Sequence, residues 1–305
     1  MSNSALAGPA RRFKQVAVLM GGPSSERDVS LRSGAAVARG LREAGYDVSE
    51  VDVTGRTLEL PAGTEAVFVA LHGEFGEDGQ VQALLEEKGI PYTGSNPEAS
   101  RASFDKLLTK DILVKCGVST PRYEVLRKGQ PRTLPLPVVV KPPRQGSSIG
   151  VHRVFNESEW TSAIEDAFRF DMELLVEEYI EGRELTVGVV GHEVMPIVEI
   201  VAPGDWYSYD AKYTKGKTQY RVPADIGPVA TAKCVGLALQ TFKALGCAGF
   251  GRVDIRLAPD GGAYVLELNN IPGFTETSLL PKAASEYGLS FPTLCDRIMN
   301  AIPTR

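Results

Sequence analysis

Short apolar or alternating runs and longer helical runs take turns along the first hundred residues. QVAVLM (15–20), VSEVDV (48–53) and AVFVALHG (66–73) predict strands, and helical spacing predicts helices over about 27–44 and 78–87. Strands that alternate with helices are typical of βαβ units, so we expect an α/β layer with a parallel sheet. The candidate site residues of this part follow the carboxyl ends of strands, where open α/β sheets bind ligands.

From about residue 103 to 190 the pattern changes. A helical run, FDKLLTKDILVKCG, precedes four short strand-like runs, PVVVKP, VHRVF, LLVEEYI and ELTVGVV, with one more helix near 157–170. This mixture predicts a small α+β unit.

The last third begins with a polar loop over about 203–220 and continues with a long helix around 229–245. Two strong strands follow, GRVDIRL (251–257) and YVLELN (264–269), and the chain ends in a loop and two short helices. The sequence contains no internal repeat and no low-complexity segment.

Composition narrows the function classes. A chain of 305 residues with 43% hydrophobic positions can build two or three domains with real cores. A net charge of -5 disfavours a nucleic-acid partner, which requires excess Lys and Arg, so we expect small-molecule partners. Four singly placed cysteines favour a reduced, cytoplasmic protein. The first apolar run is too short for a signal peptide or a membrane span, so no membrane partner is expected.

The two strong strands carry the most informative polar residues. Side chains alternate along a strand, so Glu267 and Asn269 are expected on one face, and Asp254 can lie opposite them if the strands are antiparallel neighbours. Three hard oxygen donors of this kind suit Mg²⁺ in ATP-dependent transfer. Arg252 shares the face of Asp254 and could stabilise charge that develops on a transferred oxygen. The alternative is a set of exposed carboxylates on a solvated face.

Two segments of the middle unit fit a nucleotide. The loop KPPRQGSSIGV follows a strand that ends in Lys141, and its small residues could fold over phosphates, although it lacks the Walker A pattern and could be an ordinary hairpin. The segment LLVEEYIEGREL offers Glu177, Tyr179 and Glu184 around a base and a ribose.

The first glycine-rich turn, GGPSSERDVS, opens a helix and lacks the GxGxxG dinucleotide fingerprint. Ser25 and Asp28 have capping-box spacing, and Glu26 at the helix start has a plausible structural role as a cap. His72, in the loop HGEFGEDG, would usually be structural.

Together these segments resemble the D-alanine–D-alanine ligase family of the ATP-grasp superfamily. The resemblance extends from about residue 16 to 281 and is carried, in order, by GGPSSERDVSLRSG, LHGEFGEDG, Asp105-Lys106, VVVKPPRQGSSIGV, EEYIEGRELTVGV, YDAKYTKGKTQY, GRVDIRL and LELNNIPGFTETSLLP.

The resemblance implies an ATP-grasp fold with an N-terminal parallel-sheet (preATP-grasp) domain. Its expected units are 1–103 with the first D-alanine site, 104–190 for the nucleotide, and 191–305 with magnesium, catalysis and a lid over 203–220. It implies ATP as co-substrate, two Mg²⁺ or Mn²⁺ ions and a role in peptidoglycan synthesis. A homodimer is common among proteins that resemble this one.

The resemblance also implies roles for single residues. Lys106, Lys141, Ser147, Glu177, Tyr179, Ile180, Glu184 and Lys212 would bind ATP, and Asp254, Glu267 and Asn269 would bind the metal. Glu26, with help from His72, would hold the first D-alanine, and Ser278 and Leu279 would hold the carboxylate of the second. Arg252 and the Gly273 backbone N–H would stabilise the oxyanion, and Glu26, Ser147 and Tyr213 would form a hydrogen-bonded triad.

The chain departs from the usual sequence of the family at Asn270, Ile271 and Phe274, and its region 54–63 is shorter than is usual in the family. A ligase of the same fold that uses D-lactate or D-serine as second substrate is therefore an alternative. A nucleotide-binding regulatory protein without turnover would not need the full metal and oxyanion set, and a Rossmann oxidoreductase would need the missing glycine fingerprint.

Overall fold

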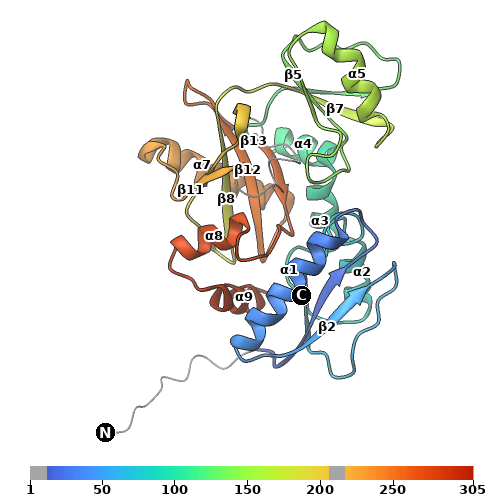
Figure 1. Ribbon diagram of the computed structural model, residues 1–305, viewed down its shortest axis with the longest axis vertical. Coiled ribbons are helices and arrows are strands. Elements are labelled where there is room, and N and C mark those ends of the chain that lie inside the picture. The colour runs from blue at the N-terminus through green and yellow to red at the C-terminus, as the bar shows by residue number, and fades with distance from the viewer. Residues whose placement is uncertain (1–11, 206–216, 305) are drawn as a thin grey trace.

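The N-terminal sheet of the computed structural model is parallel, as the alternating pattern predicts. The structure describes residues 12–205 and 217–304. β1 (Gln15–Gly21) lies between β2 (Asp47–Val53) and β3 (Ala66–Val69). α1 (Arg27–Glu43) follows β1, and α2 (Gln80–Glu87) follows β3 (Figure 1). The expected strand over 66–73 ends early, so Leu71 to Gly73 lie in the loop that follows β3.

The central sheet is antiparallel, in the order β4-β7-β5-β6. Its strands are β4 (Tyr123–Arg127), β5 (Val138–Lys141), β6 (His152–Val154) and β7 (Glu173–Glu178). α5 (Glu157–Ala167) packs Ala163 and Ala167 against a core of strand residues that includes Val138, Val140 and Val176. Val139, between Val138 and Val140 on β5, is buried as well, so this strand is covered on both faces.

The third sheet has six strands in the described chain. β8 (Arg183–Val190), β10 (Val198–Val201), β11 (Gln219–Arg221), β12 (Phe250–Leu257) and β13 (Ala263–Asn269) run in the order β11-β10-β8-β12-β13, and β9 (Glu193–Val194) pairs with β8. A one-turn 3-10 helix, Pro203–Asp205, follows β10. α7 (Gly227–Leu245) packs on one face of the sheet through residues such as Leu237 and Phe242.

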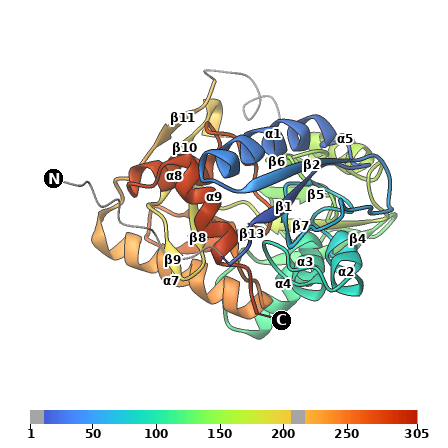
Figure 2. The same cartoon turned by 90° about the horizontal axis from the view of Figure 1, so that it is seen from below.

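Two C-terminal helices join the third sheet to the first. α8 (Leu279–Glu286) and α9 (Phe291–Asn300) share one core with β1, β3 and α1, and α9 lies beside α1 when the molecule is seen from below (Figure 2). Gly40 of α1 makes this approach possible, because a Cβ there would stand 3.0 Å from Phe291 and 3.1 Å from Cys295. The hydrophobic cores therefore do not follow the order of the chain.

The structure corrects several sequence predictions. The helix expected over 104–117 begins at Asp105, whose side chain caps α4 (Lys106–Lys115), and an unpredicted helix, α3 (Pro97–Phe104), precedes it. β4 and β10 were also not predicted. The capping box at Ser25 is wrong, because Glu26 is the N-cap residue of α1 and makes no side-chain cap bond. β8 pairs with β10 and β12 of the third sheet.

No helix in the described part of the chain combines the length and the apolar character needed to cross a membrane.

Candidate active site

A cleft of about 830 Å³ lies where the three sheets meet. Every predicted site residue in the described ranges lines it, and together they come from all three sheets and their loops: Glu26, His72, Lys106, Lys141, Ser147, Glu177, Tyr179, Ile180, Glu184, Arg252, Asp254, Glu267, Asn269, Gly273, Ser278 and Leu279. Lys212 and Tyr213 lie outside the described residues. The structure thus brings together segments that are far apart in the sequence.

The strands β12 and β13 pair antiparallel, with Asp254 opposite Glu267 and Arg252 opposite Asn269. A bulge lies between these pairs and the rest of the ladder, because Ile255 is opposite Val265 and Leu266 is the extra residue. Val265 and Leu268 both face the core under α7, so the bulge changes the phase of the strand. Without it, Glu267 would share the core face with Val265.

Arg252 and Asp254 form a rigid polar pair on this strand face. Arg252 donates from Nε to Asp254 Oδ1 at 3.1 Å and from Nη2 to Oδ2 at 3.1 Å, and Nε also reaches Thr186 Oγ1 at 2.8 Å. The Thr186 hydroxyl donates to Asp254 Oδ1 at 2.5 Å, and Asn269 Nδ2 donates to Oδ2 at 3.0 Å. The guanidinium is therefore held by partners on two strands.

Glu267 faces a cation from another element. Its Oε2 lies 3.3 Å from Lys106 Nζ, which also donates to the Gln145 carbonyl at 2.9 Å. Among the described residues there is no group of three or more His, Cys, Asp or Glu side chains placed to hold a metal. The donors here are two carboxylates and an amide, Asp254, Glu267 and Asn269, and hard oxygen ligands of this number fit Mg²⁺, which takes its other ligands from phosphates and water.

Glu177 is buried at the bottom of the cleft between two lysines. Its carboxylate forms ion pairs with Lys110 Nζ and Lys141 Nζ. Burial alone would raise the pKa of Glu177, but the charges and hydrogen bonds of the two lysines outweigh it and hold the pKa below its usual range. Burial also lowers the pKa of Lys110 to about 8, against the opposing charge of Glu177.

The residues that follow Glu177 form one wall of the cleft. Tyr179 packs edge-on against Phe155, with ring centroids 5.1 Å apart, and its backbone N–H donates to Pro137 O at 3.1 Å. Ile180 lines the same wall. Glu184 lies 3.2 Å from Arg256, which is buried and donates to Gly182 O at 2.8 Å.

The glycine- and serine-rich loop connects the antiparallel strands β5 and β6, so it is a hairpin loop, and it also projects into the cleft. Ser147 and Ser148 have φ angles of 52° and 60°, a left-handed conformation that is costly for residues other than glycine. The Ser147 hydroxyl donates to Glu26 Oε1 at 2.5 Å. A Cβ at Gly146 would stand 2.8 Å from Glu26 Oε2. The loop therefore contacts the N-terminal domain directly.

His72 sits between the N-terminal sheet and the segment after β13. Nδ1 donates to Ile271 O at 3.1 Å in the tautomer that lets Ser33 Oγ donate to Nε2 at 3.1 Å, and Ser33 Oγ in turn accepts from Phe274 N–H at 3.1 Å. Glu77, which the sequence analysis missed, lies 3.5 Å from His72 Nδ1. Burial raises the pKa of Glu77, and its bond to His72 opposes that shift.

Ser278, Leu279 and Gly273 line the cleft from the segment that follows β13. Ser278 is the N-cap residue of α8 and Leu279 is the first residue of that helix. The Ser278 hydroxyl accepts from Thr275 N–H at 3.0 Å and lies 2.9 Å from Thr275 Oγ1. A helix N-terminus with free backbone N–H groups favours a carboxylate.

Of the three residues that depart from the family's usual sequence, Ile271 lines the cleft, and Asn270 and Phe274 make structural contacts. Asn270 is buried and donates to Glu77 O at 2.8 Å and Ser100 O at 3.3 Å. Phe274 packs against Phe68, Phe250 and Phe291.

Sequence reasoning missed Lys110, Thr186, Arg256 and Glu77. One signal was available for Lys110, because it lies four residues after Lys106 and so on the same helix face. The burial of Lys110 depends on tertiary packing, which spacing does not give.

Two family profiles match the chain. The profile described as "D-ala D-ala ligase N-terminus" matches residues 54–95, and "D-ala D-ala ligase C-terminus" matches residues 113–300. A D-alanine--D-alanine ligase of Syntrophotalea carbinolica is 48% identical over 292 residues, which cover 94% of this chain and 95% of the relative. One of Methylacidiphilum infernorum is 44% identical and covers 94% of each chain.

Solved structures agree with these relatives. The D-alanine--D-alanine ligase of Bacillus anthracis complexed with ATP has a TM-score of 0.83 at 32% identity, with 95% of this chain and 97% of that chain covered. The VanG D-Ala:D-Ser ligase of Enterococcus faecalis has a TM-score of 0.82 at 29% identity, with 95% and 99% covered.

Proposed function

We infer the roles of the cleft residues from one premise: this chain belongs to the D-alanine–D-alanine ligase family and is an ATP-grasp enzyme of that family. Its reaction joins two D-alanines and consumes ATP. The dipeptide product is used to build peptidoglycan. The observation that carries the assignment to the cleft is the meeting of Glu26, Ser147, Arg252 and Asp254, from three sheets, in one cavity.

We place ATP between the central sheet and the third sheet. Glu177, Tyr179 and Ile180 would contact the adenine through the carboxylate and the backbone, and Glu184 would accept from the ribose hydroxyls. Lys106, Lys141 and Lys212 would contact the phosphates, with Ser147 and its loop above them. In the structure Lys141 pairs with Glu177, so its ammonium group lies beside the proposed base site.

Asp254, Glu267 and Asn269 would hold Mg²⁺ or Mn²⁺, with two ions proposed. A bound divalent ion would neutralise phosphate charge and polarise the γ-phosphoryl group. The cationic side chains of Arg252 and Lys106 beside these ligands compensate the two carboxylates.

The first D-alanine would bind with its ammonium group against Glu26, with His72 nearby. One of its carboxylate oxygens attacks the γ-phosphorus, the bond to the β–γ bridging oxygen breaks, and ADP leaves the new D-alanyl phosphate. Our proposed role for the chain here is orientation: Glu26 fixes the donor while the lysines fix the phosphate, so the two reactants meet in line.

The second D-alanine would bind its carboxylate at Ser278 and at the Leu279 backbone N–H. Its amine attacks the acyl carbon, phosphate leaves with the oxygen that came from the first carboxylate, and the amine loses a proton. Arg252 and the Gly273 N–H would stabilise the tetrahedral oxyanion. The hydrogen bonds that Asp254 and Thr186 make to Arg252 support this role, because they fix the guanidinium before charge develops.

Tyr213, Ser147 and Glu26 would form the triad that orients the acceptor, and 203–220 would close as a lid, because water hydrolyses an acyl phosphate. The Ser147–Glu26 bond supports two members of this triad.

The test supplies the purified protein with ATP, Mg²⁺ and D-alanine and follows phosphate release and product mass. We expect phosphate release that requires D-alanine, with D-alanyl-D-alanine as the product. Adding D-serine or D-lactate as a competitor shows whether either serves as the second substrate, because each gives a product of different mass. Phosphate release that is independent of D-alanine would contradict the assignment.

The domain division 1–103, 104–190 and 191–305, a homodimer and a cytoplasmic location are further proposals. Limited proteolysis tests the division, and light scattering tests the dimer. The pairing of β8 with β12 favours placing 183–190 with the last unit.

A further inference from the structure

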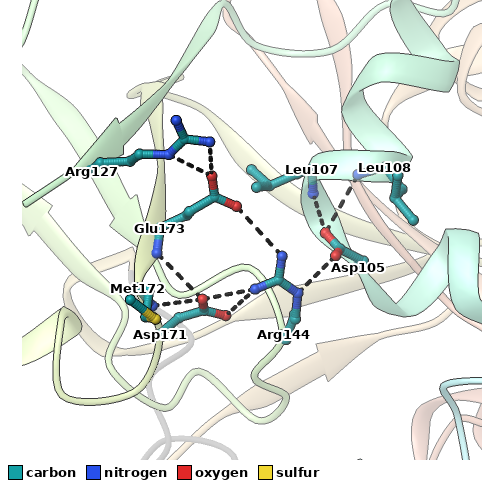
Figure 3. A network of polar contacts seen from close by, with 8 residues as sticks. All are labelled: Asp105, Leu107, Leu108, Arg127, Arg144, Asp171, Met172 and Glu173. Carbon is teal, nitrogen blue, oxygen red and sulfur yellow. Dashed lines mark hydrogen bonds and ion pairs between the residues drawn. The ribbon is translucent and has the colours of Figure 1, made fainter.

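The glycine- and serine-rich loop between β5 and β6 is here called the phosphate loop. Arg144 is the charged residue at its base, and it lies among three carboxylates (Figure 3). Its Nε donates to Asp105 Oδ2 at 2.9 Å, and Nη1 donates to both Asp171 oxygens at 2.8 and 3.0 Å. Nη2 lies 3.6 Å from Glu173 Oε2. A planar guanidinium can serve three acceptors in fixed directions, which an ammonium group cannot do.

These partners fix two different elements. Asp105 is the N-cap residue of α4, where its Oδ1 accepts from Leu107 N–H at 2.9 Å while its Oδ2 accepts from Arg144. Asp171 precedes β7 and is 7% exposed at its side chain, so its bond to Arg144 is well shielded from water. Arg144 therefore ties the loop to the start of α4 and to the start of β7.

The backbone on either side of Arg144 binds the same helix start. Lys106 N–H donates to Pro143 O at 3.1 Å, and Lys106 Nζ donates to Gln145 O at 2.9 Å. Three consecutive loop residues thus contact the pair Asp105–Lys106. Two residues beyond Gln145, Ser147 reaches Glu26 across the cleft.

We propose that Arg144 is a positioning residue for nucleotide binding: it holds the phosphate loop and Lys106 in one fixed relation, so that both reach the phosphates of ATP without further ordering. This rests on the proposed function of the cleft. The benefit is preorganisation, since a loop that must be ordered on binding weakens affinity. Arg144 itself lies at the loop base and acts through Asp105 and Asp171.

Arg127 of β4 provides a matched control. It also pairs with Glu173, through Nε at 3.0 Å and Nη2 at 2.8 Å to Oε1, but its contacts lie on the outer side of the network in Figure 3, away from Arg144 and Asp105. Its side chain is 72% exposed. A merely structural role of Arg144 would lower the melting temperature of its variants without a matching loss of nucleotide affinity.

The experiment compares Arg144→Ala, Arg144→Lys and Arg127→Ala by KM for ATP, kcat, dissociation constant for ADP and melting temperature. We expect Arg144→Ala to raise KM for ATP and the ADP dissociation constant about five- to tenfold with a smaller change in kcat. Arg144→Lys should lie between wild type and Arg144→Ala, and Arg127→Ala should stay within about twofold of wild type, as expected for an exposed ion pair.

A double-mutant cycle tests the route of the effect. Asp171→Asn keeps the shape of the side chain, so it also serves if Arg144→Ala does not fold. If Arg144 acts through Asp171, the effects of Arg144→Ala and Asp171→Asn on nucleotide affinity will be clearly less than additive. Additive effects would contradict this route.

The proposal is overturned if Arg144→Ala, or Asp171→Asn in its place, leaves nucleotide affinity within twofold of wild type, or if Arg127→Ala shifts it equally. A wild-type protein that binds ADP but does not turn over with D-alanine would contradict the proposed function alone, because the ADP measurement still decides the role of Arg144.

Discussion

The cleft is lined by one group of residues on strands and another on loops, and different interactions hold the two groups in position. The strand-borne group, Arg252, Asp254, Glu267 and Asn269, is placed by the ladder between β12 and β13 and by a bulge. The loop-borne group consists of Glu26, Gly146 and Ser147. Ser147 donates a hydrogen bond to Glu26, which is 121 residues away in the sequence, and Gly146 lies close to the same carboxylate. Residues on a ladder keep their geometry without ligand, whereas the loop residues depend on contacts between domains.

This difference separates chemistry from substrate positioning. The strand-borne group carries the proposed metal and oxyanion residues, which must be exact in the transition state. The loop-borne group carries residues that hold the donor substrate and must let it enter and leave. Changes in the first group should lower kcat, and changes in the second should mainly alter kcat/KM for D-alanine.

The largest effect is expected for Glu267→Gln. Losing one carboxylate of the proposed metal site should remove several kcal/mol of transition-state stabilisation, which is roughly a 10³-fold fall in kcat. Glu87→Gln, at an exposed position of α2, is the control. Phosphate-release kinetics measure kcat for both variants, and the melting temperature shows whether they are folded. An unchanged kcat of Glu267→Gln with normal metal dependence would contradict a role of Glu267 in the metal site.

The next effect is expected at Ser147. Its hydroxyl donates to a carboxylate, so Ser147→Ala should cost about 1.5–3 kcal/mol, or about 10- to 150-fold in kcat/KM for D-alanine. Ser147→Gly separates the hydroxyl from the backbone, because glycine accepts the φ of 52°. Equal losses in both variants support the hydroxyl, and full activity of Ser147→Gly would show that the backbone conformation alone matters.

Ser278→Ala should have a smaller and more selective effect. Because Thr275 already occupies part of the hydrogen-bonding capacity of the hydroxyl, we expect about a tenfold rise in KM for the second D-alanine and little change for the first. Ser285→Ala, at an exposed position of the same helix, is the control. Equal effects on both substrates, separated by their two binding phases, would contradict the placement of the acceptor carboxylate.

The last effect concerns stability and not turnover, and it leaves both groups in place. With a pKa of about 8 when folded and 10.5 when exposed, Lys110 has lost its proton in the folded protein over a range where the unfolded chain still holds it. Stability from this group therefore rises with pH between these values, by at most about 1.4 kcal/mol per pH unit.

Urea unfolding of wild type and Lys110→Met at pH 7, 8.5 and 9.5 measures this difference. The wild type should gain stability relative to the variant as the pH rises, and Lys115→Met, at an exposed position of the same helix, should run parallel to wild type. Parallel curves for Lys110→Met would contradict the shifted pKa.

The strand-borne group could be predicted from sequence because period-two alternation and strand pairing are local rules. The facing of Asp254 and Glu267 is confirmed, yet the bulge at Leu266 was invisible, because only the packing of Val265 and Leu268 on α7 reveals it. The break at Asp105 was missed because the apolar pattern continues through it.

The loop-borne group could not be derived from spacing. The Ser147–Glu26 bond joins two domains, and only the family resemblance paired these residues. The buried pair of Lys110 and Glu177 was missed for the same reason, since burial of a charge is a property of the assembled core and not of either segment. Roles assigned to Lys212 and Tyr213 stay predictions.

The most direct test of the account follows the oxygen that the proposed mechanism transfers. D-alanine labelled with ¹⁸O in its carboxylate is turned over with ATP, and the released phosphate is analysed by mass. We expect one ¹⁸O atom in each phosphate, because the donor carboxylate oxygen leaves with phosphorus when the amine attacks. Phosphate without label would contradict a D-alanyl phosphate intermediate.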